Sequence, residues 1–382
     1  VPFNFASRHG STFINAALDG TALTANTTPT ALPYLQATDL EIGRKFMGTI
    51  GKFRVWSDDL TDTGIATASA PTFTTEFAMT IATTGANETF TIPCQNSGTF
   101  NAGIEWGDGS VSTVTSYNDA SLTHTYATAG DHLIRIRGSF PNIRFNNTGD
   151  KLKVKSVENL GTVGWTKLDK AFRGCTNMTS FTAGTTDTSS VTNMTEMFRD
   201  CTSITSLNVS SFNTSSVTMF SSMFRSCTSL TSLDVTNFDT SSASGANGIQ
   251  AMFYQCSSLT SLDVSNFDTS SATNFSSVFR QLTLTSLDVS NFDTSSATYM
   301  GYMFTDSNNL TSLDLSNFDT SSVTSMRNML NCSSLTSIVG AEDFDITSFN
   351  ATNGLNGFLD SNGKMTTAQY DALLVKWDAQ SV

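Results

Sequence analysis

The chain of 382 residues carries 33 acidic against 20 basic residues, a formal net charge of −13, and only 14% charged residues. Such a negative balance disfavours binding to phosphate backbones, so we expect no nucleic acid partner. No apolar run approaches the roughly 18–20 residues of a membrane span, so we expect no membrane insertion. The hydrophobic content of 38% is sufficient for a core. At about 100–200 residues per domain, the length suggests two or three folded units.

Residues 1–69 read as a short set of β-strands. Residues 48–56 (GTIGKFRVW), followed by DDLTD at 58–62, predict a strand, and residues 12–20 predict a preceding hairpin. The segment resembles the C-terminal part of a laminin-G/concanavalin-like jelly roll. A full jelly roll needs far more chain. The resemblance therefore implies that residues 1–69 dock onto an upstream part of the polypeptide or onto another virion or surface subunit. If that subunit is a second copy of the chain, the protein is a homo-oligomer.

Residues 73–148 predict a small all-β domain. Residues 77–81 and 132–136 alternate apolar and polar side chains between turns. EWGDGS at 105–110 and HTY at 124–126 resemble the polycystic-kidney-disease (PKD) type β-sandwich. In physical terms, residues 107–109 predict a tight turn, and Trp106 and Tyr126 predict core anchors.

From about residue 171 the sequence repeats itself. Large apolar residues recur at steps of 26, 26, 29, 26, 25 and 26 residues. They are Phe172, Phe198, Phe224, Phe253, Phe279, Phe304 and Leu330. Such a period indicates an array of stacked units that bury their apolar faces against one another.

Each unit contains two apolar patterns. Leu233 and Val235 alternate as in a strand with one buried face, which predicts strands in one parallel sheet. The strand positions are Leu207, Leu233, Leu262, Leu287 and Leu313. Val191, Met194 and Phe198 recur at helical spacing, which predicts about two turns of helix per unit. Near the end, residues 366–369 (TTAQ) predict a capping box that opens a last helix.

The unit CTSLTSLDVTNFDTSS, which begins at Cys227, resembles the BspA-like leucine-rich-repeat surface proteins. That resemblance covers about residues 150–382 and implies an extracellular or virion-displayed recognition protein without catalysis. The predicted fold is therefore multidomain: β-sandwich modules followed by an α/β leucine-rich-repeat solenoid with a C-terminal capping helix. Its parts are the jelly-roll piece at 1–69, the PKD-like domain at 73–148, the solenoid at 149–351 and the cap at 352–382.

Five of the six cysteines occupy the same or a neighbouring place in successive units. They are Cys175, Cys201, Cys227, Cys256 and Cys332, with Leu282 and Ser307 filling that place in two other units. Exchange with leucine favours a ladder of buried thiols. Bonded pairs between neighbouring units stay an alternative. Cys94 reads as a lone core thiol.

Exposed carboxylates recur in two columns. Asp234, Asp263, Asp288 and Asp314 follow the buried leucine of each unit, and with Ser232 and Thr236 they form a candidate ligand-binding face. This column has three interpretations: solvated carboxylates, a calcium site with all-oxygen ligands, or direct ligand recognition. A second column is read as turn or helix caps. Its members are Asp239, Asp268, Asp293, Asp319 and Asp345.

The sequence offers no catalytic residues, because no nucleophile motif, phosphate loop or histidine cluster is present. We expect a non-enzymatic surface recognition or attachment protein, a phage tail or capsid fibre component that contacts a host-surface glycan or protein. The alternative is a bacterial cell-surface adhesin or matrix protein. A carbohydrate-active enzyme is a remote alternative, since it needs paired carboxylates in a cleft. Localisation is expected at a virion surface or outside the cell, with no cofactor except possible calcium.

Overall fold

The computed structural model describes residues 5–10, 13–18, 21–22, 75–349, 354–359 and 366–380. The chain divides into two compact units, Val1–Thr72 and Phe73–Val382, which are described separately below.

The first unit contains three antiparallel strands in the order β1-β2-β3. They are β1 (Phe5–Gly10), β2 (Phe13–Leu18) and β3 (Thr21–Ala22). β2 and β3 pair antiparallel, with Leu18 opposite Thr21, which agrees with the hairpin predicted over residues 12–20. The predicted closing strand at residues 48–56 lies outside the described residues.

The second unit opens with six strands and a short 3₁₀ helix. They are β4 (Phe77–Thr83), β5 (Glu88–Thr91), β6 (Asn101–Glu105), β7 (Val111–Val114), η1 (Ala120–Leu122), β8 (Thr123–Tyr126) and β9 (Gly130–Ser139). β4 and β9, which contain the two segments of predicted alternation, pair along their length. Trp106 and Tyr126 are fully buried, and the Tyr126 hydroxyl donates 2.9 Å to the Trp106 carbonyl, so both predicted core anchors are confirmed.

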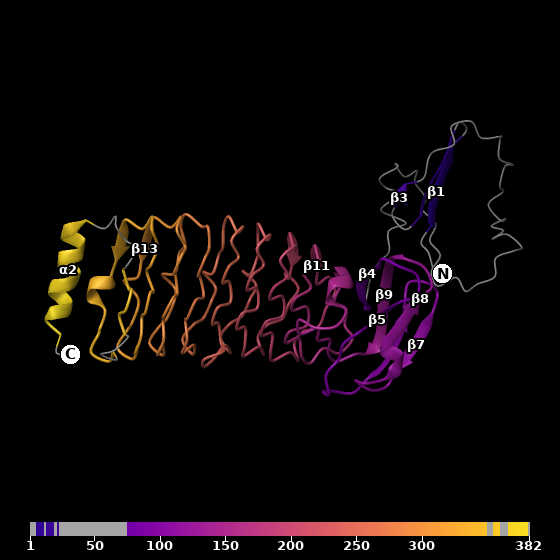
Figure 1. Cartoon of the computed structure of the whole chain (residues 1–382), viewed down its shortest axis with the longest axis horizontal. Helices are drawn as coiled ribbons and strands as arrows, with labels where there is room; N and C mark the ends of the chain where they lie inside the picture. Colours follow the sequence, from indigo (N-terminus) through magenta and orange to yellow (C-terminus); the bar gives the residue numbers. More distant parts are fainter. Residues whose placement is uncertain are drawn as a thin grey trace, which may run out of the picture. The chain divides into compact units, whose positions relative to one another are not determined.

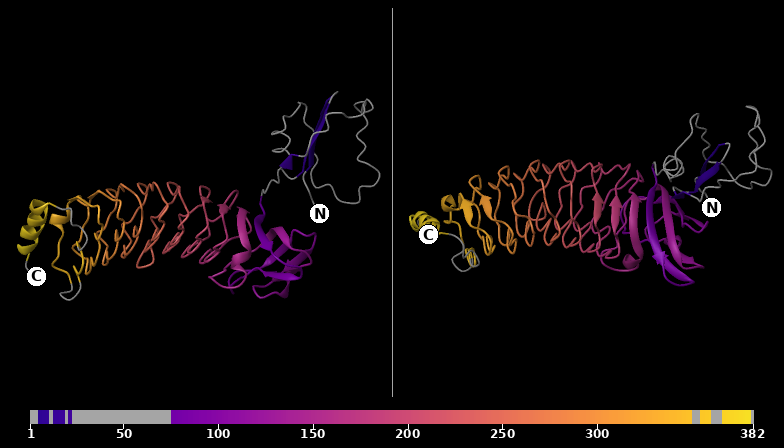
Figure 2. Two further views of the ribbon diagram at one scale, coloured as in Figure 1. Left: turned by 45° about the horizontal axis from the view of Figure 1, so that its top comes forward. Right: turned by 90° about the horizontal axis from the view of Figure 1, so that it is seen from above.

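One sheet runs from this β-rich region directly into the repeats. After η2 (Lys151–Lys153), strand β10 (Val154–Asn159) pairs antiparallel with β4 and parallel with β11 (Ser180–Thr182). β11 in turn pairs parallel with β12 (Ser206–Asn208). The full order is β12-β11-β10-β4-β9-β6-β7, and Figure 2 shows these strands beside the first repeats. β10 therefore joins an antiparallel sheet to a parallel one.

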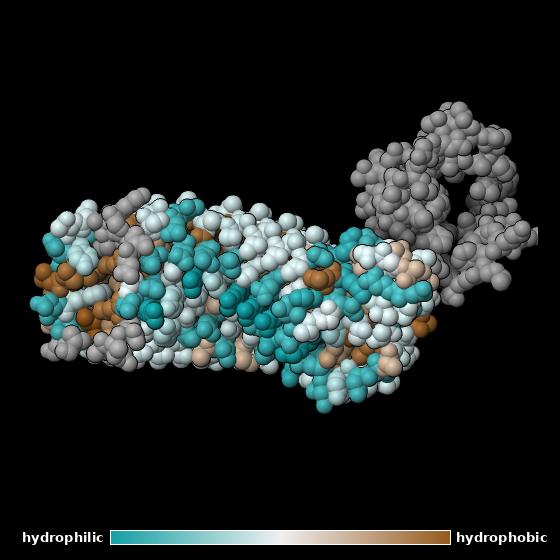
Figure 3. All heavy atoms as spheres, in the orientation of Figure 1, coloured by the Kyte–Doolittle hydropathy of each residue, from teal (hydrophilic) through white to brown (hydrophobic). Residues whose placement is uncertain are grey.

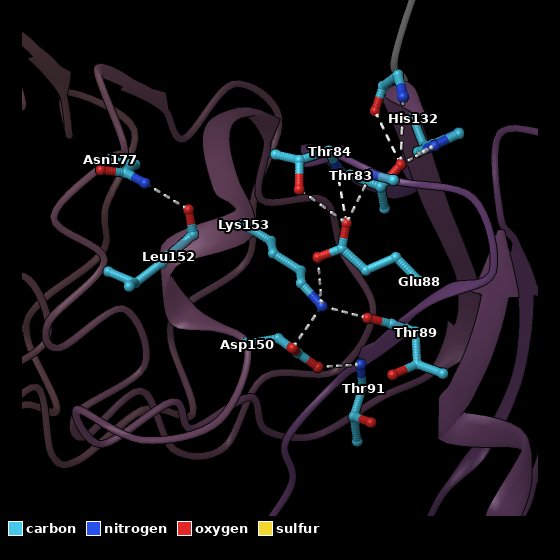
Figure 4. A network of polar contacts seen from close by, with 12 residues as sticks. Thr83, Thr84, Glu88, Thr89, Thr91, His132, Asp150, Leu152, Lys153 and Asn177 are labelled. Carbon is cyan, nitrogen blue, oxygen red and sulfur yellow. Dashed lines mark hydrogen bonds and ion pairs between the residues drawn. The ribbon is translucent and has the colours of Figure 1, made fainter. Parts of the chain in front are cut away.

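Polar contacts also connect residues 150–153 to strand β5 of the β-rich region (Figure 4). The Lys153 ammonium lies 3.1 Å from Glu88 and 2.8 Å from Asp150, and it also donates to the Thr89 carbonyl. The second Asp150 oxygen accepts 2.8 Å from the Thr91 amide. These bonds tie β5 to the segment that leads into the repeats.

The repeats form a row of stacked coils between β11 and the C-terminal helix (Figure 1), but they are not an α/β leucine-rich-repeat solenoid. Among the described residues the only α-helix is α2 (Thr367–Asp378), at the end of the chain. The only repeat strands in that part of the chain are β11 and β12, and the separate pair β13 (Ser312–Asp314) and β14 (Ser337–Val339). Strands form at Leu207 and Leu313 as predicted, but none forms at Leu233, Leu262 or Leu287. The predicted single parallel sheet and the predicted helix per unit are therefore both wrong.

The backbone hydrogen bonds explain why the helical spacing produces no helix. The amides of Met194, Glu196 and Phe198 donate to carbonyls of the next repeat at 2.9–3.0 Å. The amides of Met197 and Arg199 instead donate at 3.2 Å to the carbonyls three residues earlier, those of Met194 and Glu196. A helix would need each of these donors for the carbonyl four residues earlier. Glu196 also adopts a φ of 56°, and the corresponding residue of every repeat from Lys170 to Asn328 is left-handed as well.

A ladder of phenylalanines forms the centre of the repeat core. Rings of successive repeats stack at centroid distances of 5.7–6.1 Å with interplanar angles of 4–18°. The ladder comprises Phe172, Phe198, Phe224, Phe253, Phe279 and Phe304. All six are fully buried, so the sequence period correctly identified the inward-facing position.

The chain ends with η3 (Ala341–Asp343) and α2. The predicted capping box is confirmed, because Thr366 and Gln369 exchange side-chain and backbone bonds. Leu373 and Trp377 are buried, whereas Tyr370 and Leu374 are 46% and 44% exposed, so α2 packs on the end of the stack through Leu373 and Trp377. Figure 3 shows apolar residues at this end of the unit. No helix in the part of the chain that the structure describes has the length and apolar character of a membrane span.

Candidate functional site

The structure brings the first set of aspartates together as a column on successive repeats. Asp234, Asp263, Asp288 and Asp314, here called the aspartate column, are all exposed. Neighbouring members repel one another: Asp263 acts on Asp234, and Asp288 acts on both Asp263 and Asp314. Ser232 and Thr236 are exposed beside Asp234, so the predicted face exists as a polar surface.

Each member of the aspartate column holds a local turn with one carboxylate oxygen. Asp234 Oδ1 accepts 3.0 Å from the Thr236 amide and 2.6 Å from its hydroxyl. Asp314 accepts the same two bonds from Ser316 at 3.0 and 2.6 Å. These bonds lower the pKa of each carboxyl, although the neighbouring charges oppose the shift. The outer oxygen of each carboxylate is the one left for a ligand.

The second column caps turns, as predicted. Asp239 Oδ1 accepts 3.0 Å from the Ser241 amide and 2.6 Å from its hydroxyl. The same pattern recurs at the other members, Asp268, Asp293, Asp319 and Asp345. Asn213 takes this position in an earlier repeat and accepts the same two bonds at 3.1 and 2.8 Å. The position therefore requires an acceptor oxygen and not a charge.

Buried threonines lock this turn to the next repeat. The Thr269 hydroxyl, 1% exposed, donates 2.8 Å to the Asp293 carbonyl, and Thr240 donates 2.9 Å to the Asp268 carbonyl. The same bond is made throughout the stack by Thr188, Thr214, Thr294 and Thr320. Because the turn is held from inside, its exposed carboxylate projects from a fixed backbone.

The aspartate column does not form a cation site on its own. Among the described residues, no three His, Cys, Asp or Glu side chains come together in a group that could hold a metal ion. One oxygen of each carboxylate is already used by the turn. The column therefore supplies a row of single outer oxygens rather than the cluster of six to eight oxygens that calcium requires.

The cysteines carry thiols and not disulfides, as predicted. The five cysteines of the repeats are fully buried. The Cys201 thiol donates 3.1 Å to the Phe172 carbonyl, and the Cys256 thiol donates 3.1 Å to the Phe224 carbonyl. Burial raises the pKa of the Cys256 thiol to about 12. These thiols act as small apolar side chains with one weak hydrogen bond.

The histidines of the β-rich region pack against its aromatic side chains. His124 Nε2 lies 2.8 Å from Asp108 Oδ2, and its ring stacks on Trp106 at 5.0 Å. His132 stacks on Tyr126 at 3.7 Å and lies 3.0 Å from the Thr83 hydroxyl. Burial lowers the pKa of His132. Both rings therefore extend the aromatic core.

Sequence reasoning missed a second kind of column. Arg225, Tyr254, Arg280, Tyr302 and Arg327, here called the arginine–tyrosine column, stack alternately along the repeats. The guanidinium carbon of Arg225 lies 4.6 Å from the Tyr254 ring centroid, and that of Arg280 lies 5.2 Å from the same centroid. Arg280 and Arg327 lie 5.3 and 5.9 Å from the Tyr302 centroid.

A signal for this column was present in the sequence. Between residues 174 and 363 the only bases are Arg199, Arg225, Arg280 and Arg327. All four lie within three residues of a ladder phenylalanine or of Leu330, its counterpart in the last repeat. The scarcity of basic residues, combined with the place that Arg199, Arg225 and Arg280 share directly after a ladder phenylalanine, could have identified this side of the stack.

A family model described as "Mycoplasma protein of unknown function, DUF285" matches residues 166–260 and 247–358. Together the two matches span about half of the chain and include both the aspartate column and the arginine–tyrosine column. The match is consistent with a BspA-like surface repeat protein. It does not extend to residues 1–69 or 73–148, whose PKD and laminin-G resemblances stay predictions. No curated protein and no solved structure matches the chain.

Proposed function

This chain belongs to the DUF285 family, and from that premise we propose that it is a non-enzymatic recognition protein displayed on a surface. Its role is to attach its bearer to a cell-surface glycan or protein. The BspA-like character of the repeats supports the proposal, since their resemblance is to surface proteins.

The observation that carries the proposal is the exposed aspartate column. Four carboxylates recur on consecutive repeats, each fixed by a turn bond and each flanked by exposed Ser or Thr side chains. Hydroxyl groups of a glycan can donate to the outer carboxylate oxygens and accept from the Ser and Thr hydroxyls. A rigid array with a regular repeat suits a ligand that itself repeats.

Two settings fit this role. A virion fibre is supported by the jelly-roll resemblance of residues 1–69, which would anchor the chain to another subunit. A bacterial surface is supported by the family description, which names Mycoplasma. Immunogold labelling with an antibody against this chain separates them, because the label falls on virus particles in one case and on the bacterial envelope in the other.

Attachment itself is tested with the fluorescently labelled chain on intact host cells. The double variant Asp263→Asn and Asp288→Asn removes two charges but keeps the turn acceptors, as Asn208 and Asn213 already do in this chain. We expect weaker attachment with an unchanged melting temperature. Unchanged attachment would exclude the aspartate column as the binding face, and no attachment of the wild-type chain to any candidate host would contradict the proposed function.

A further inference from the structure

We propose that the arginine–tyrosine column binds an acidic polysaccharide, one whose carboxylate or sulfate groups recur along the chain with uncharged sugars between them. The inference rests on the proposed function for the general class of ligand. It concerns a different part of each repeat from the aspartate column.

Stacking covers the faces of the guanidinium groups and fixes the planes in which they lie. Tyr254 lies between Arg225 and Arg280, and Arg280 lies between Tyr254 and Tyr302, so the faces of these groups are covered. The Nε atoms of Arg225 and Arg280 are buried without a hydrogen bond. A guanidinium held by its face presents its terminal N–H groups in a fixed plane, which suits planar binding of a carboxylate or sulfate.

The arginines of this column make few direct ion pairs. Arg225 and Arg327 make no ion pair with any described residue, and Arg280 has one carboxylate partner, Asp306, at 3.5 Å. The preceding repeats differ, because Arg199 lies 2.5 Å from Glu196 and 3.5 Å from Asp200. The ionisable groups that act on Arg225 are the like charge of Arg199, the ring of Tyr254, and the more distant carboxylates of Asp200 and Glu196; no member of the aspartate column is among them. Three arginines therefore lie in one row with a single direct carboxylate partner among the described residues, in a chain of net charge −13.

The spacing indicates a polymer with separated charges. Consecutive arginines of the column are two repeats apart, which corresponds to about 10 Å at the usual distance between neighbouring strands. Nucleic acid presents phosphates much more densely, at about 3.4 Å along a strand, and three arginines in an acidic protein are a poor match for it.

Half-buried polar side chains lie next to the column, namely Ser226, Gln255 and Gln281. Tyrosine hydroxyls and these side chains can bond the hydroxyls of intervening sugars.

Hyaluronate, which carries a carboxylate on alternate sugars, is a suitable probe, and neutral dextran is the matched uncharged polymer. We expect the full chain to bind immobilised hyaluronate in a salt-dependent manner and to ignore dextran. The triple variant Arg225→Gln, Arg280→Gln and Arg327→Gln should lose affinity by at least about tenfold, since each charge-assisted bond contributes measurably. Absence of hyaluronate binding by the wild-type chain, or equal binding by the triple variant, would overturn the inference.

Single variants test the inference even if the triple variant fails to fold. Arg327→Gln changes an exposed member of the column, whereas Arg199→Gln makes the same change of charge at an arginine already paired with Glu196 and Asp200. Arg327→Gln should weaken hyaluronate binding several-fold more than Arg199→Gln does, and equal effects would overturn the assignment to this column. Equal affinity for single-stranded DNA would overturn the assignment to a polysaccharide.

The same variants separate the inference from the proposed function. Retained cell attachment without hyaluronate binding would contradict the inference alone. Hyaluronate binding without attachment to any host cell or surface would contradict the proposed function alone.

Discussion

The hydroxyl of Ser307 donates a hydrogen bond of 2.6 Å to the backbone carbonyl of Phe279. It also accepts 3.1 Å from the amide of Leu282, so a single fully buried oxygen satisfies a donor and an acceptor of the preceding repeat. Cysteine thiols bond the corresponding carbonyl in other repeats. This position therefore links each repeat to the one before it.

Replacing Ser307 by alanine should destabilise the chain by about 1–3 kcal/mol, because it leaves the Leu282 amide and the Phe279 carbonyl buried without partners. Urea unfolding followed by circular dichroism measures the change. Ser286→Ala, at an exposed position, is the control and should stay within about 0.5 kcal/mol. Equal effects of the two substitutions would show that the Ser307 bridge contributes nothing to stability.

The buried threonines should contribute more than exposed threonines that make the same kind of bond. Thr269→Val removes the 2.8 Å bond from the buried Thr269 hydroxyl to the Asp293 backbone carbonyl and should cost about 1–3 kcal/mol. Thr298→Val removes a 3.1 Å bond to the Thr273 carbonyl, but Thr298 is exposed, so water can replace the lost donor. The two free energies of unfolding are compared under identical conditions. A larger loss of stability for Thr298→Val than for Thr269→Val would contradict the role assigned to the buried threonines.

Acid should weaken the stack through its turn carboxylates. Hydrogen bonds from Ser265 and Ser290 lower the pKa of Asp263 and Asp288 below the usual value near 3.8. A pKa that is lower in the folded chain gives stability that is complete above the unfolded value, and this stability is lost as pH falls through the folded value. The free energy of unfolding should therefore be level from about pH 7 to 5 and fall below about pH 4.

The variant with asparagine at residues 263 and 288 isolates this effect, because it keeps the turn acceptors and removes two titrating groups. Its free energy of unfolding should decline less than that of the wild-type chain between about pH 7 and 3. Parallel declines would show that these two carboxylates are not linked to folding.

The thiols should be inert until the chain unfolds. Burial raises the pKa of Cys94, Cys256 and Cys332 to about 12, from a usual value of 9.0. That difference lowers the thiolate fraction at about pH 8 roughly a thousandfold. Alkylation followed by mass spectrometry should modify Cys94 first, since it alone is partly exposed, and all six cysteines after denaturation without a reductant. Blocked thiols in the denatured chain would indicate disulfides.

The sequence predicted which residues face inward but not what the backbone does between them. Leu233, Phe238 and Met194 are buried at the positions that the repeat period indicates. The spacing of Met194 and Phe198 fits a helix equally well as it fits a series of turns. The choice depends on carbonyls of the next repeat, which accept the amides of both residues. A periodicity within one repeat carries no information about hydrogen bonds between repeats.

The candidate site was predictable only where its members are alike and occupy equivalent places. Asp263 and Asp288 occur in the same motif, so their alignment in a column followed from the period alone. Arg225 and Tyr254 occupy equivalent places but differ in chemistry, and Tyr302 lies three residues earlier in its repeat than that place. Their stacking depends on side-chain direction, which the sequence pattern does not specify.

Strand β10 has a consequence for how the repeats are built. The first repeat strand, β11, pairs with one edge of β10, and the other edge of β10 pairs with β4. The β-rich region can therefore act as a template on which the row grows in one direction. A fragment that begins after β10 would start with an unpaired strand edge, which is prone to pair with other chains. Truncation at the predicted boundary near residue 148 retains β10 but removes β4, and it would leave the other edge of β10 open instead. Growth of the stack would then lack its fixed end, and misaligned registers or intermolecular sheets would compete with the native array.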